Sequence, residues 1–234
     1  KAIRAFEHFI PKVDPDALAL FLKFNYVPAP QTIYSGVFKL EAGHYVEIGS
    51  DCTPEPFWDP FAVVENRANY AGPSTDDAWL SQLEFLLEDA VQNQMQSDVP
   101  LGAFLSGGID SSLIVALMQK HSSSKINTFS IGFNEKHFNE APFAKSVAKH
   151  LGTNHYEHYV DAKDALDLVP LIPRIYDEPF SDSSQIPTTL VSQLAREKVT
   201  VSLSGDGGDE LFGGYNRHIY FTILKKLNRL HIYI

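Results

Sequence analysis

Residues 106–112 read Ser-Gly-Gly-Ile-Asp-Ser-Ser and bring together groups that bind phosphate. Gly107 and Gly108 let a ligand approach the backbone closely, because they carry no side chain. The hydroxyls of Ser106 and Ser111, with the free N–H groups at the start of a helix, can hold anionic oxygens. The only acid of the segment, Asp110, stands where a divalent cation would be needed beside phosphates. The segment therefore predicts a phosphate-binding loop that also holds Mg²⁺.

This loop is not a Walker A motif, because it lacks the Gly-Lys-Ser/Thr sequence that grips the β and γ phosphates. The alternative is a plain glycine turn that closes a core strand. The combination of two glycines, an acid and three serines between an apolar strand and a helix favours the phosphate-binding interpretation.

A second loop at residues 204–214 has three acids and five glycines among its eleven residues. Such a loop is costly to order without a ligand, because glycine loses more backbone freedom on folding than other residues. Its acids are Asp206, Asp209 and Glu210. Their spacing does not fit an EF-hand, which leaves a calcium loop as the weaker alternative.

Both loops follow short apolar segments, 101–105 and 199–203, with the pattern of buried strands. Between them we expect strands at 126–133 and 156–160, and helices at 140–151, within 164–176 and at 184–198. This alternation predicts an α/β fold with a doubly wound parallel sheet and helices on both faces. Ligands bind such sheets at the carboxyl ends of the strands. There Ile131 could offer backbone groups and an apolar wall to an adenine ring, with a plain core strand as the alternative.

A long amphipathic helix is expected from Asp76 to about Gln96, leading into the first strand. Its spacing predicts a buried side made of Trp79, Leu80, Leu83, Leu86, Leu87, Ala90, Val91 and Met95.

The first 73 residues are expected to form a connector, separate from a catalytic region at 74–234. An Asp cap and an early proline predict a short helix over 14–24. Residues 37–40 and 44–48 alternate apolar and polar side chains around a turn at 41–43, which predicts a hairpin. Residues 50–75 are rich in proline and glycine, as in a linker, and Trp58 is expected to hold this segment on a surface.

The composition limits the function. The net charge of −10 argues against a nucleic-acid partner, because phosphate contacts require clustered Lys and Arg. The single cysteine, Cys52, excludes an internal disulfide and favours a reducing cytoplasm. No apolar run approaches membrane-spanning length, so no membrane is expected. The missing start methionine and the apolar ending at Ile234 suggest a fragment cut at both ends.

The first loop resembles the pyrophosphate loop of the ATP pyrophosphatases, also called PP-loop or adenine nucleotide alpha hydrolase-like enzymes. With Ser-Gly-Asp-Gly-Gly-Asp-Glu-Leu-Phe-Gly-Gly-Tyr about a hundred residues later, the chain resembles the synthetase domain of glutamine-hydrolysing asparagine synthetases. Residues 128–133, 139–141 and 150–153 also fit. Residues 14–48 look like that family's linker and hairpin, so the resemblance covers nearly the whole chain and implies the same α/β fold.

The resemblance implies a role for each motif residue. Leu105, Ile131, Ser204 and Gly205 would contact ATP. Pyrophosphate and Mg²⁺ would be held by Ser106, Gly107, Gly108, Asp110 and Ser111, with Asp209 as a second metal candidate. Asp206 stands where the family often has Glu, at a position tied to forming the β-aspartyl-AMP intermediate. A carboxylate is retained there, but it is one methylene shorter.

The resemblance also implies the reaction and its partners. A carboxylate, most plausibly aspartate, would receive AMP from ATP, and ammonia would then displace the AMP. The ammonia would come from an N-terminal glutaminase domain, which is missing from this sequence. A lysine that the family uses late in the synthetase domain would lie beyond Ile234, so the fragment is expected to hold an incomplete active site. A homodimer stays open.

Other functions remain open. The segment 178–188 lacks the arginine that well-studied asparagine synthetases use to grip aspartate. Another cation, such as Arg174 or Arg217, could replace it, or the acceptor could be a uronic acid sugar bound by Ser181, Asp182, Ser183 and Gln185. A different AMP-forming ligase and a non-catalytic partner subunit are further alternatives. A zinc site is disfavoured by the spacing of His137, His150, His155 and His158 across a helix and a strand.

Overall fold

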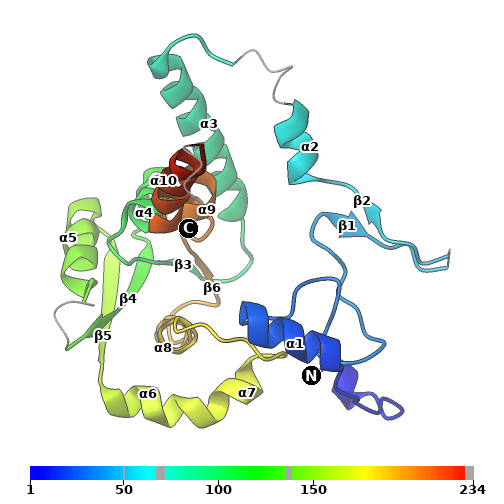
Figure 1. Ribbon diagram of the computed structural model, residues 1–234. Coiled ribbons are helices and arrows are strands. Elements are labelled where there is room, and N and C mark those ends of the chain that lie inside the picture. Colours follow the sequence, from blue (N-terminus) through cyan, green and yellow to red (C-terminus); the bar gives the residue numbers. More distant parts are fainter. Residues whose placement is uncertain (50, 67–71, 135–138, 230–234) are drawn as a thin grey trace. The chain divides into compact units, whose positions relative to one another are not determined.

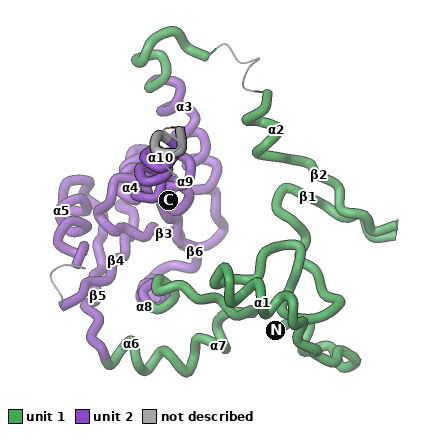
Figure 2. The backbone as a smooth tube through the Cα atoms, viewed as in Figure 1, with its two compact units in different colours: residues 1–80, 163–186 green, residues 81–162, 187–234 purple. Residues whose placement is uncertain are grey.

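The computed structural model describes residues 1–49, 51–66, 72–134 and 139–229. The chain divides into two compact units, shown in different colours in Figure 2. Unit 1 contains Lys1–Leu80 and Lys163–Ile186, and unit 2 contains Ser81–Ala162 and Pro187–Ile234. The boundaries fall within helix α3 (Asp76–Gln94), helix α6 (Ala162–Leu168) and helix α8 (Gln185–Arg196).

Unit 2 is built on a four-stranded parallel sheet (Figure 1). The strands are β3 (Leu101–Phe104), β4 (Asn127–Phe133), β5 (Asn154–Val160) and β6 (Val201–Leu203), in the order β5-β4-β3-β6. The intervening helices of this unit include α4 (Ile109–His121), α5 (Ala141–Leu151) and most of α8. The predicted parallel α/β sheet is confirmed, and each predicted strand lies within a few residues of its expected position.

Separate apolar cores cover the two faces of this sheet, as the doubly wound fold requires. Successive side chains of a strand point to opposite faces. Ala103 of β3 packs in a core with residues of α3, α4 and α5, whereas Phe104 packs beside Phe129 against α8. The first core contains Val91, Leu105, Val115, Leu117, Met118, Ile126, Ala144 and Ala148.

Helix α3 begins at the predicted position, but only its C-terminal half has the expected buried side. Val91 is buried, and Leu87 and Met95 pack against the core of unit 2. By contrast, Trp79, Leu80, Leu83, Leu86 and Ala90 are exposed. The prediction of a fully buried side is therefore wrong, because apolar periodicity identifies a helix face without showing what covers it.

Unit 1 begins with a short 3-10 helix, η1 (Ile3–Ala5), followed by α1 (Pro15–Phe24). Helix α1 forms as predicted: Asp14 caps it, accepting hydrogen bonds from the N–H groups of Asp16 and Ala17. Its buried residue Ala17 packs with Val27 and Ile33 in a small core.

The predicted hairpin between residues 37–40 and 44–48 is wrong. Strand β1 (His44–Tyr45) instead pairs antiparallel with β2 (Glu55–Pro56). Phe38 forms an isolated bridge with Gln31. The turn at Gly43 exists, with the left-handed φ of +73° that glycine allows, and its carbonyl accepts hydrogen bonds from Phe57 and Trp58. A short helix, α2 (Pro60–Glu65), follows in the proline-rich segment.

Residues 163–186 join unit 1 through polar contacts with the N-terminal segment. This stretch holds the rest of α6, a 3-10 helix η3 (Val169–Leu171) and helix α7 (Ile172–Ile175). Both oxygens of the Glu178 carboxylate are engaged: one accepts from the Ile33 N–H at 2.8 Å and the other pairs with Lys39 at 2.5 Å. The Lys39 ammonium also donates to the Val27 carbonyl. These contacts tie segments far apart in sequence into one unit.

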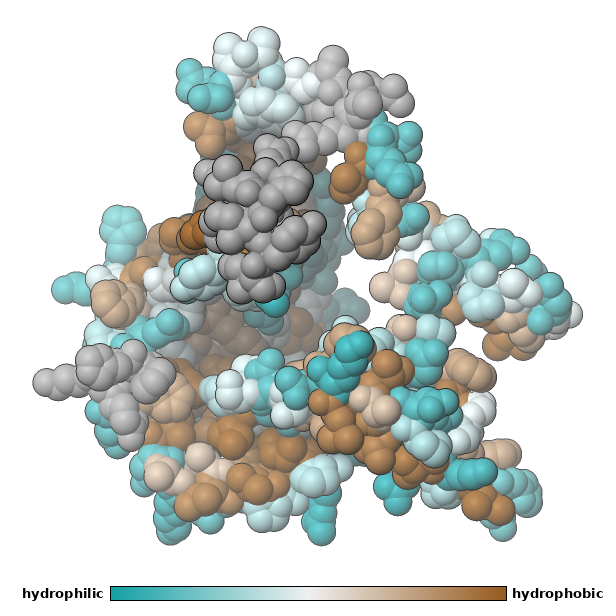
Figure 3. Space-filling view, viewed as in Figure 1, coloured by the Kyte–Doolittle hydropathy of each residue, from teal (hydrophilic) through white to brown (hydrophobic). Residues whose placement is uncertain are grey.

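Apolar surface is visible over α6, η3 and α7 in the space-filling view (Figure 3). It comes from Leu166, Val169, Leu171 and Ile175, which are all exposed. Among the described residues, no helix combines the length and the apolar character needed to cross a membrane.

Candidate active site

The phosphate-loop candidate connects β3 to α4, as the sequence predicts. Gly107 has a φ of +86°, a left-handed conformation that a side chain would strain. An added Cβ there would also lie 2.6 Å from the Ala144 nitrogen and 2.8 Å from the Phe143 carbonyl carbon. Glycine is therefore required at this position both by the turn and by the close approach of α5.

Hydrogen bonds between its own serines hold the loop. The Ser106 and Ser111 hydroxyls lie 2.9 Å apart, and the Ser106 N–H donates to the Ser111 hydroxyl at 3.2 Å. The Gly108 N–H donates to the Ser106 hydroxyl. Leu105, which opens the loop, is buried, and its N–H donates to the Phe129 carbonyl of β4 at 2.9 Å. The loop is thus fixed both internally and to the neighbouring strand.

The second glycine-rich loop connects β6 to the short helix α9 (Gly208–Phe212) and packs directly on the first. A Cβ on Gly205 would lie 2.6 Å from the Ser111 nitrogen and 2.9 Å from the Asp110 carbonyl carbon. A Cβ on Gly208 would lie 2.6 Å from the Asp110 Cγ. The structure therefore brings the two predicted loops into contact, with glycine at each meeting point.

The acids of the second loop are each held by local contacts. The Ser204 hydroxyl donates to Asp206 Oδ2 at 3.0 Å. The Asp209 carboxylate lies against Gly214, where an added Cβ would overlap it. Asp206 is exposed, and Asp110 and Asp209 are partly exposed, so their oxygens remain open to solvent or a ligand.

A cluster at the end of this loop was not predicted from the sequence. The Tyr215 hydroxyl donates to Glu210 at 2.6 Å, and the Arg217 guanidinium lies 4.1 Å from the centre of the Tyr215 ring. The Tyr215 hydrogen bond lowers the pKa of the Glu210 carboxyl and, in return, raises the pKa of the Tyr215 hydroxyl. Glu210 belongs to α9, and Arg217 lies in the first turn of α10 (Asn216–Arg229). The cluster therefore joins α9 to α10. Its signal in the sequence is an aromatic followed two residues later by a cation.

Ile131 lies on β4, two residues beyond Phe129, which pairs with the last residue of β3, Phe104; it is partly exposed. Together, the described loops offer backbone N–H groups, serine hydroxyls and the carboxylates of Asp110 and Asp209 along the carboxyl edge of the sheet. Among the described residues, no group of three His, Cys, Asp or Glu side chains could enclose a metal by itself. Mg²⁺ does not need one, because it commonly takes one or two carboxylates together with substrate phosphates. The donor set therefore fits a phosphate-bound Mg²⁺.

The candidate acceptor residues, at and before the start of α8, belong to unit 1. Asp182 Oδ1 accepts hydrogen bonds from both the N–H and the hydroxyl of Ser184, which lowers the pKa of its carboxyl. The Gln185 amide donates to the Phe180 carbonyl. These side chains hold the turn that precedes α8. His137 lies outside the described residues.

Comparison with known proteins identifies the family. Residues 82–230 match the model of the Asparagine synthase family. The chain is 40% identical to a Methanocaldococcus jannaschii protein provisionally named asparagine synthetase (glutamine-hydrolyzing) 2, over 88% of this chain and 39% of that protein. It is 36% identical to asparagine synthetase (glutamine-hydrolyzing) 1 of Bacillus subtilis, over 94% of this chain and 34% of that protein.

The chain spans little more than a third of the length of these two relatives. The family match covers both glycine-rich loops and all four strands of the parallel sheet. These similarities, together with the parallel sheet and the contact between the two loops, show that the chain belongs to the asparagine synthase family.

Proposed function

We propose that this chain carries the ATP-dependent step of a glutamine-dependent asparagine synthetase. In this step, a substrate carboxylate takes AMP from ATP, pyrophosphate leaves, and ammonia then converts the activated carboxylate to an amide. The observation that carries the proposal is the packing of Gly205 and Gly208 against Ser111 and Asp110, because it joins the two loops into one candidate nucleotide site.

The phosphates of ATP would lie on the loop that joins β3 to α4. Ser106, Gly107, Gly108 and Ser111 offer hydroxyls and backbone N–H groups to the departing pyrophosphate. The apolar and backbone groups of Leu105 and Ile131, with Ser204 and Gly205, are suited to the rest of the nucleotide. Asp110 and Asp209 would hold Mg²⁺, which supplies positive charge beside the pyrophosphate when bound.

No protein nucleophile is required by this chemistry. A free carboxylate is a poor acylating agent, because its leaving group would be oxide, whereas AMP leaves readily from the activated form. The residues of this chain act by placing the two substrates and by neutralising the charge that builds on pyrophosphate. Asp206, which is held by Ser204, is the candidate for assisting formation of the β-aspartyl-AMP.

Several wider features form part of the proposal. Aspartate is the acceptor that the names of the relatives suggest, since both are asparagine synthetases. Residues 1–73 would connect the ATP-dependent domain, 74–234, to a glutaminase domain that supplies ammonia. A cytoplasmic location, which the single Cys52 favours, and a homodimer are also part of the proposal.

The test is isotope exchange between ATP and pyrophosphate in the full-length protein with aspartate and Mg²⁺. Asp110→Asn should lower exchange by roughly 10²- to 10³-fold, as expected for losing one electrostatic partner of the transition state. The matched control is Asp98→Asn, an exposed acid in the turn before β3, which should leave exchange unchanged. Exchange within about threefold of the parent for Asp110→Asn would refute its assignment.

A further inference from the structure

The short helix α9 carries Asp209 but has little apolar packing to hold it in place. None of its five residues is buried, and its two apolar side chains, Leu211 and Phe212, are 81% and 62% exposed. A helix of about one turn has hardly any stability of its own, because nucleation costs more than its few hydrogen bonds return. The position of Asp209 therefore depends on local contacts.

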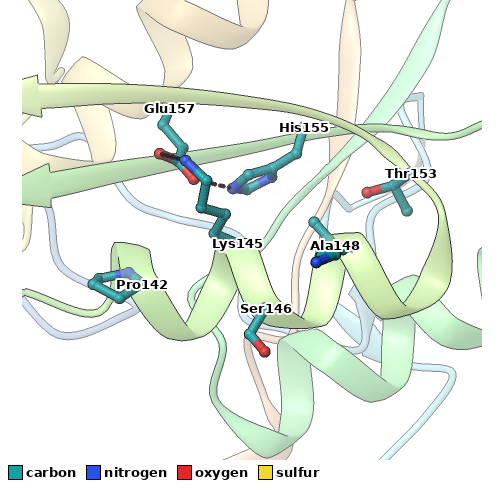
Figure 4. A pocket seen from close by; sticks show the side chains of 8 residues that line it. Pro142, Lys145, Ser146, Ala148, Thr153, His155 and Glu157 are labelled. Carbon is teal, nitrogen blue, oxygen red and sulfur yellow. Dashed lines mark hydrogen bonds and ion pairs between the residues drawn. The ribbon is translucent and has the colours of Figure 1, made fainter.

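The helix beside the first glycine-rich loop is held differently. Helix α5, whose first turn contacts Gly107, has three buried alanines that pack in unit 2. Its Lys145 also pairs with Glu157 of β5 at 3.1 Å, where the two side chains line a cavity and point toward one another (Figure 4). Helix α9, which buries none of its residues, lacks such an anchor.

The chain that leaves α9 turns back onto Asp209. Gly213 has a left-handed φ of +73°, and Gly214 donates its N–H to the Asp209 carbonyl at 3.0 Å. A Cβ on Gly214 would overlap Asp209 Oδ1, so the carboxylate rests directly on the Gly214 backbone. The orientation of the Asp209 side chain therefore depends on where Gly214 is held.

The next residue, Tyr215, closes this turn. Its hydroxyl donates to Oε1 of Glu210 at 2.6 Å, and Glu210 follows Asp209 in α9. On the ring of Tyr215, the Arg217 guanidinium lies 4.1 Å from the centre. Residues 210–215 thus form a closed loop, which runs from Glu210 through Gly214 to the Tyr215 hydroxyl and back to Glu210.

We propose that Tyr215 is a positioning residue for Asp209. By binding Glu210 it holds Gly214 against the Asp209 carboxylate, and it thereby fixes the orientation in which this carboxylate holds Mg²⁺ with ATP. The proposal rests on the nucleotide site of the proposed function. Partners that orient a metal ligand matter nearly as much as the ligand itself, because a misdirected oxygen binds the metal poorly.

The test is calorimetric titration of the full-length protein with ATP, once with Mg²⁺ and once with EDTA. Tyr215→Phe deletes the hydroxyl and keeps the ring on which Arg217 lies. It should weaken the binding of Mg-ATP roughly tenfold, the lower end of the effect of losing a partner that orients a metal ligand, and leave the binding of metal-free ATP unchanged. Tyr220→Phe, at an exposed tyrosine of α10, is the matched control and should bind both forms as the parent does.

Two results of this titration would overturn the proposal. One is binding of Mg-ATP by Tyr215→Phe with the affinity of the parent. The other is an equal loss with Mg²⁺ and with EDTA, which would show a general packing defect of the loop.

A double-mutant cycle determines whether Tyr215 acts through Asp209. Asp209→Asn should itself weaken the binding of Mg-ATP. Adding Tyr215→Phe to Asp209→Asn should then cause a further loss of less than about twofold, because residues that act as a unit are not additive. If the two losses multiply, Tyr215 acts independently of Asp209 and the proposal fails.

Variants of Glu210 distinguish a hydrogen-bond partner from a metal ligand. Glu210→Gln keeps a side-chain oxygen that can accept from the Tyr215 hydroxyl. It should bind Mg-ATP nearly as the parent does, whereas Glu210→Ala should lose as much affinity as Tyr215→Phe. Equal losses in Glu210→Gln and Glu210→Ala would mean that the charge of Glu210 is what matters, and would refute the role of Tyr215.

Hydrogen exchange of the nucleotide-free protein separates this proposal from the proposed function. The Gly214 N–H should exchange roughly three- to tenfold faster in Tyr215→Phe, as expected for losing one hydrogen bond, and at the rate of the parent in Glu210→Gln. If the protein binds no ATP, the proposed function fails, and Gly214 exchange still decides whether Tyr215 holds the turn on Asp209. An unchanged exchange rate of Gly214 in Tyr215→Phe would show that it does not.

Discussion

Substituting Gly205 by alanine tests whether the contact between the two glycine-rich loops is essential. The added Cβ would lie 2.6 Å from the Ser111 nitrogen, 2.9 Å from the Asp110 carbonyl carbon and 3.0 Å from the Ser111 Cα. These are backbone atoms in the first turn of α4, whose residues Val115 and Met118 are fully buried. Helix α4 cannot withdraw without opening the core, so the loop from β6 must move instead.

The size of the effect follows from two opposing terms. The φ of Gly205 lies outside the left-handed region, so alanine would by itself stabilise the fold by about 0.4–1 kcal/mol through the unfolded chain. Overpacking costs about 1–3 kcal/mol. The net loss is therefore between about 0 and 2.6 kcal/mol. A displacement near 1 Å in the loop would lower ATP–pyrophosphate exchange on the order of 10²-fold.

Gly208→Ala provides the matched comparison. There the crowded atoms are the Cγ and Oδ2 of Asp110, at 2.6 and 2.8 Å, which belong to a side chain that can rotate. We expect Gly208→Ala to lose exchange activity with little loss of stability, and Gly205→Ala to lose both. Native-state hydrogen exchange of the β3 amides measures the stability of unit 2. Full stability and full exchange activity in Gly205→Ala would refute the packing argument.

Three further predictions concern unit 1 and the acceptor. Lys39→Met leaves the half-buried Glu178 carboxylate with one partner fewer, which should lower the local stability of unit 1 by about 1–2 kcal/mol. Faster hydrogen exchange at residues 176–186 would report this loss. Lys12→Met, at an exposed lysine, should leave the exchange unchanged. Cys52→Ala should leave glutamate release from glutamine by the full-length protein unchanged, and a loss would make this thiol the nucleophile. With ATP, glutamine and aspartate, the full-length protein should form asparagine, and Ser183→Ala should leave the rate unaltered. No product with aspartate, but amidation of a uronic acid sugar, would show that the sugar is the acceptor.

The strands and helices of unit 2 were predictable because each carries its own signal. Short apolar segments that end at glycine-rich loops indicated buried parallel strands. In unit 1, the capping Asp14 likewise indicated the start of α1. The hairpin was not predictable in the same way. His44–Tyr45 is a two-residue strand, and its local pattern cannot tell whether 37–40 or Glu55–Pro56 pairs with it. Pairing there is decided by the turn at Gly43 and its bonds to Phe57 and Trp58.

The candidate site was predictable in position but not in detail. The rule that ligands bind at the carboxyl ends of parallel strands places both loops on one edge of the sheet. It does not reveal that Gly205 packs on the backbone of α4, because that contact depends on tertiary geometry.

The discontinuous make-up of unit 1 has a consequence for synthesis on the ribosome. The Glu178 carboxylate and the Ile33 N–H are separated by 145 residues in sequence. At about 5–20 residues per second, the N-terminal segment emerges roughly 7–30 s before its anchoring acid is made. During that interval the Ile33 N–H lacks its final acceptor, and the Lys39 ammonium lacks its carboxylate partner. Unit 1 therefore matures only after β5 has been translated, although residues 1–80 are made before those of unit 2, and until then this segment is open to chaperones and proteases.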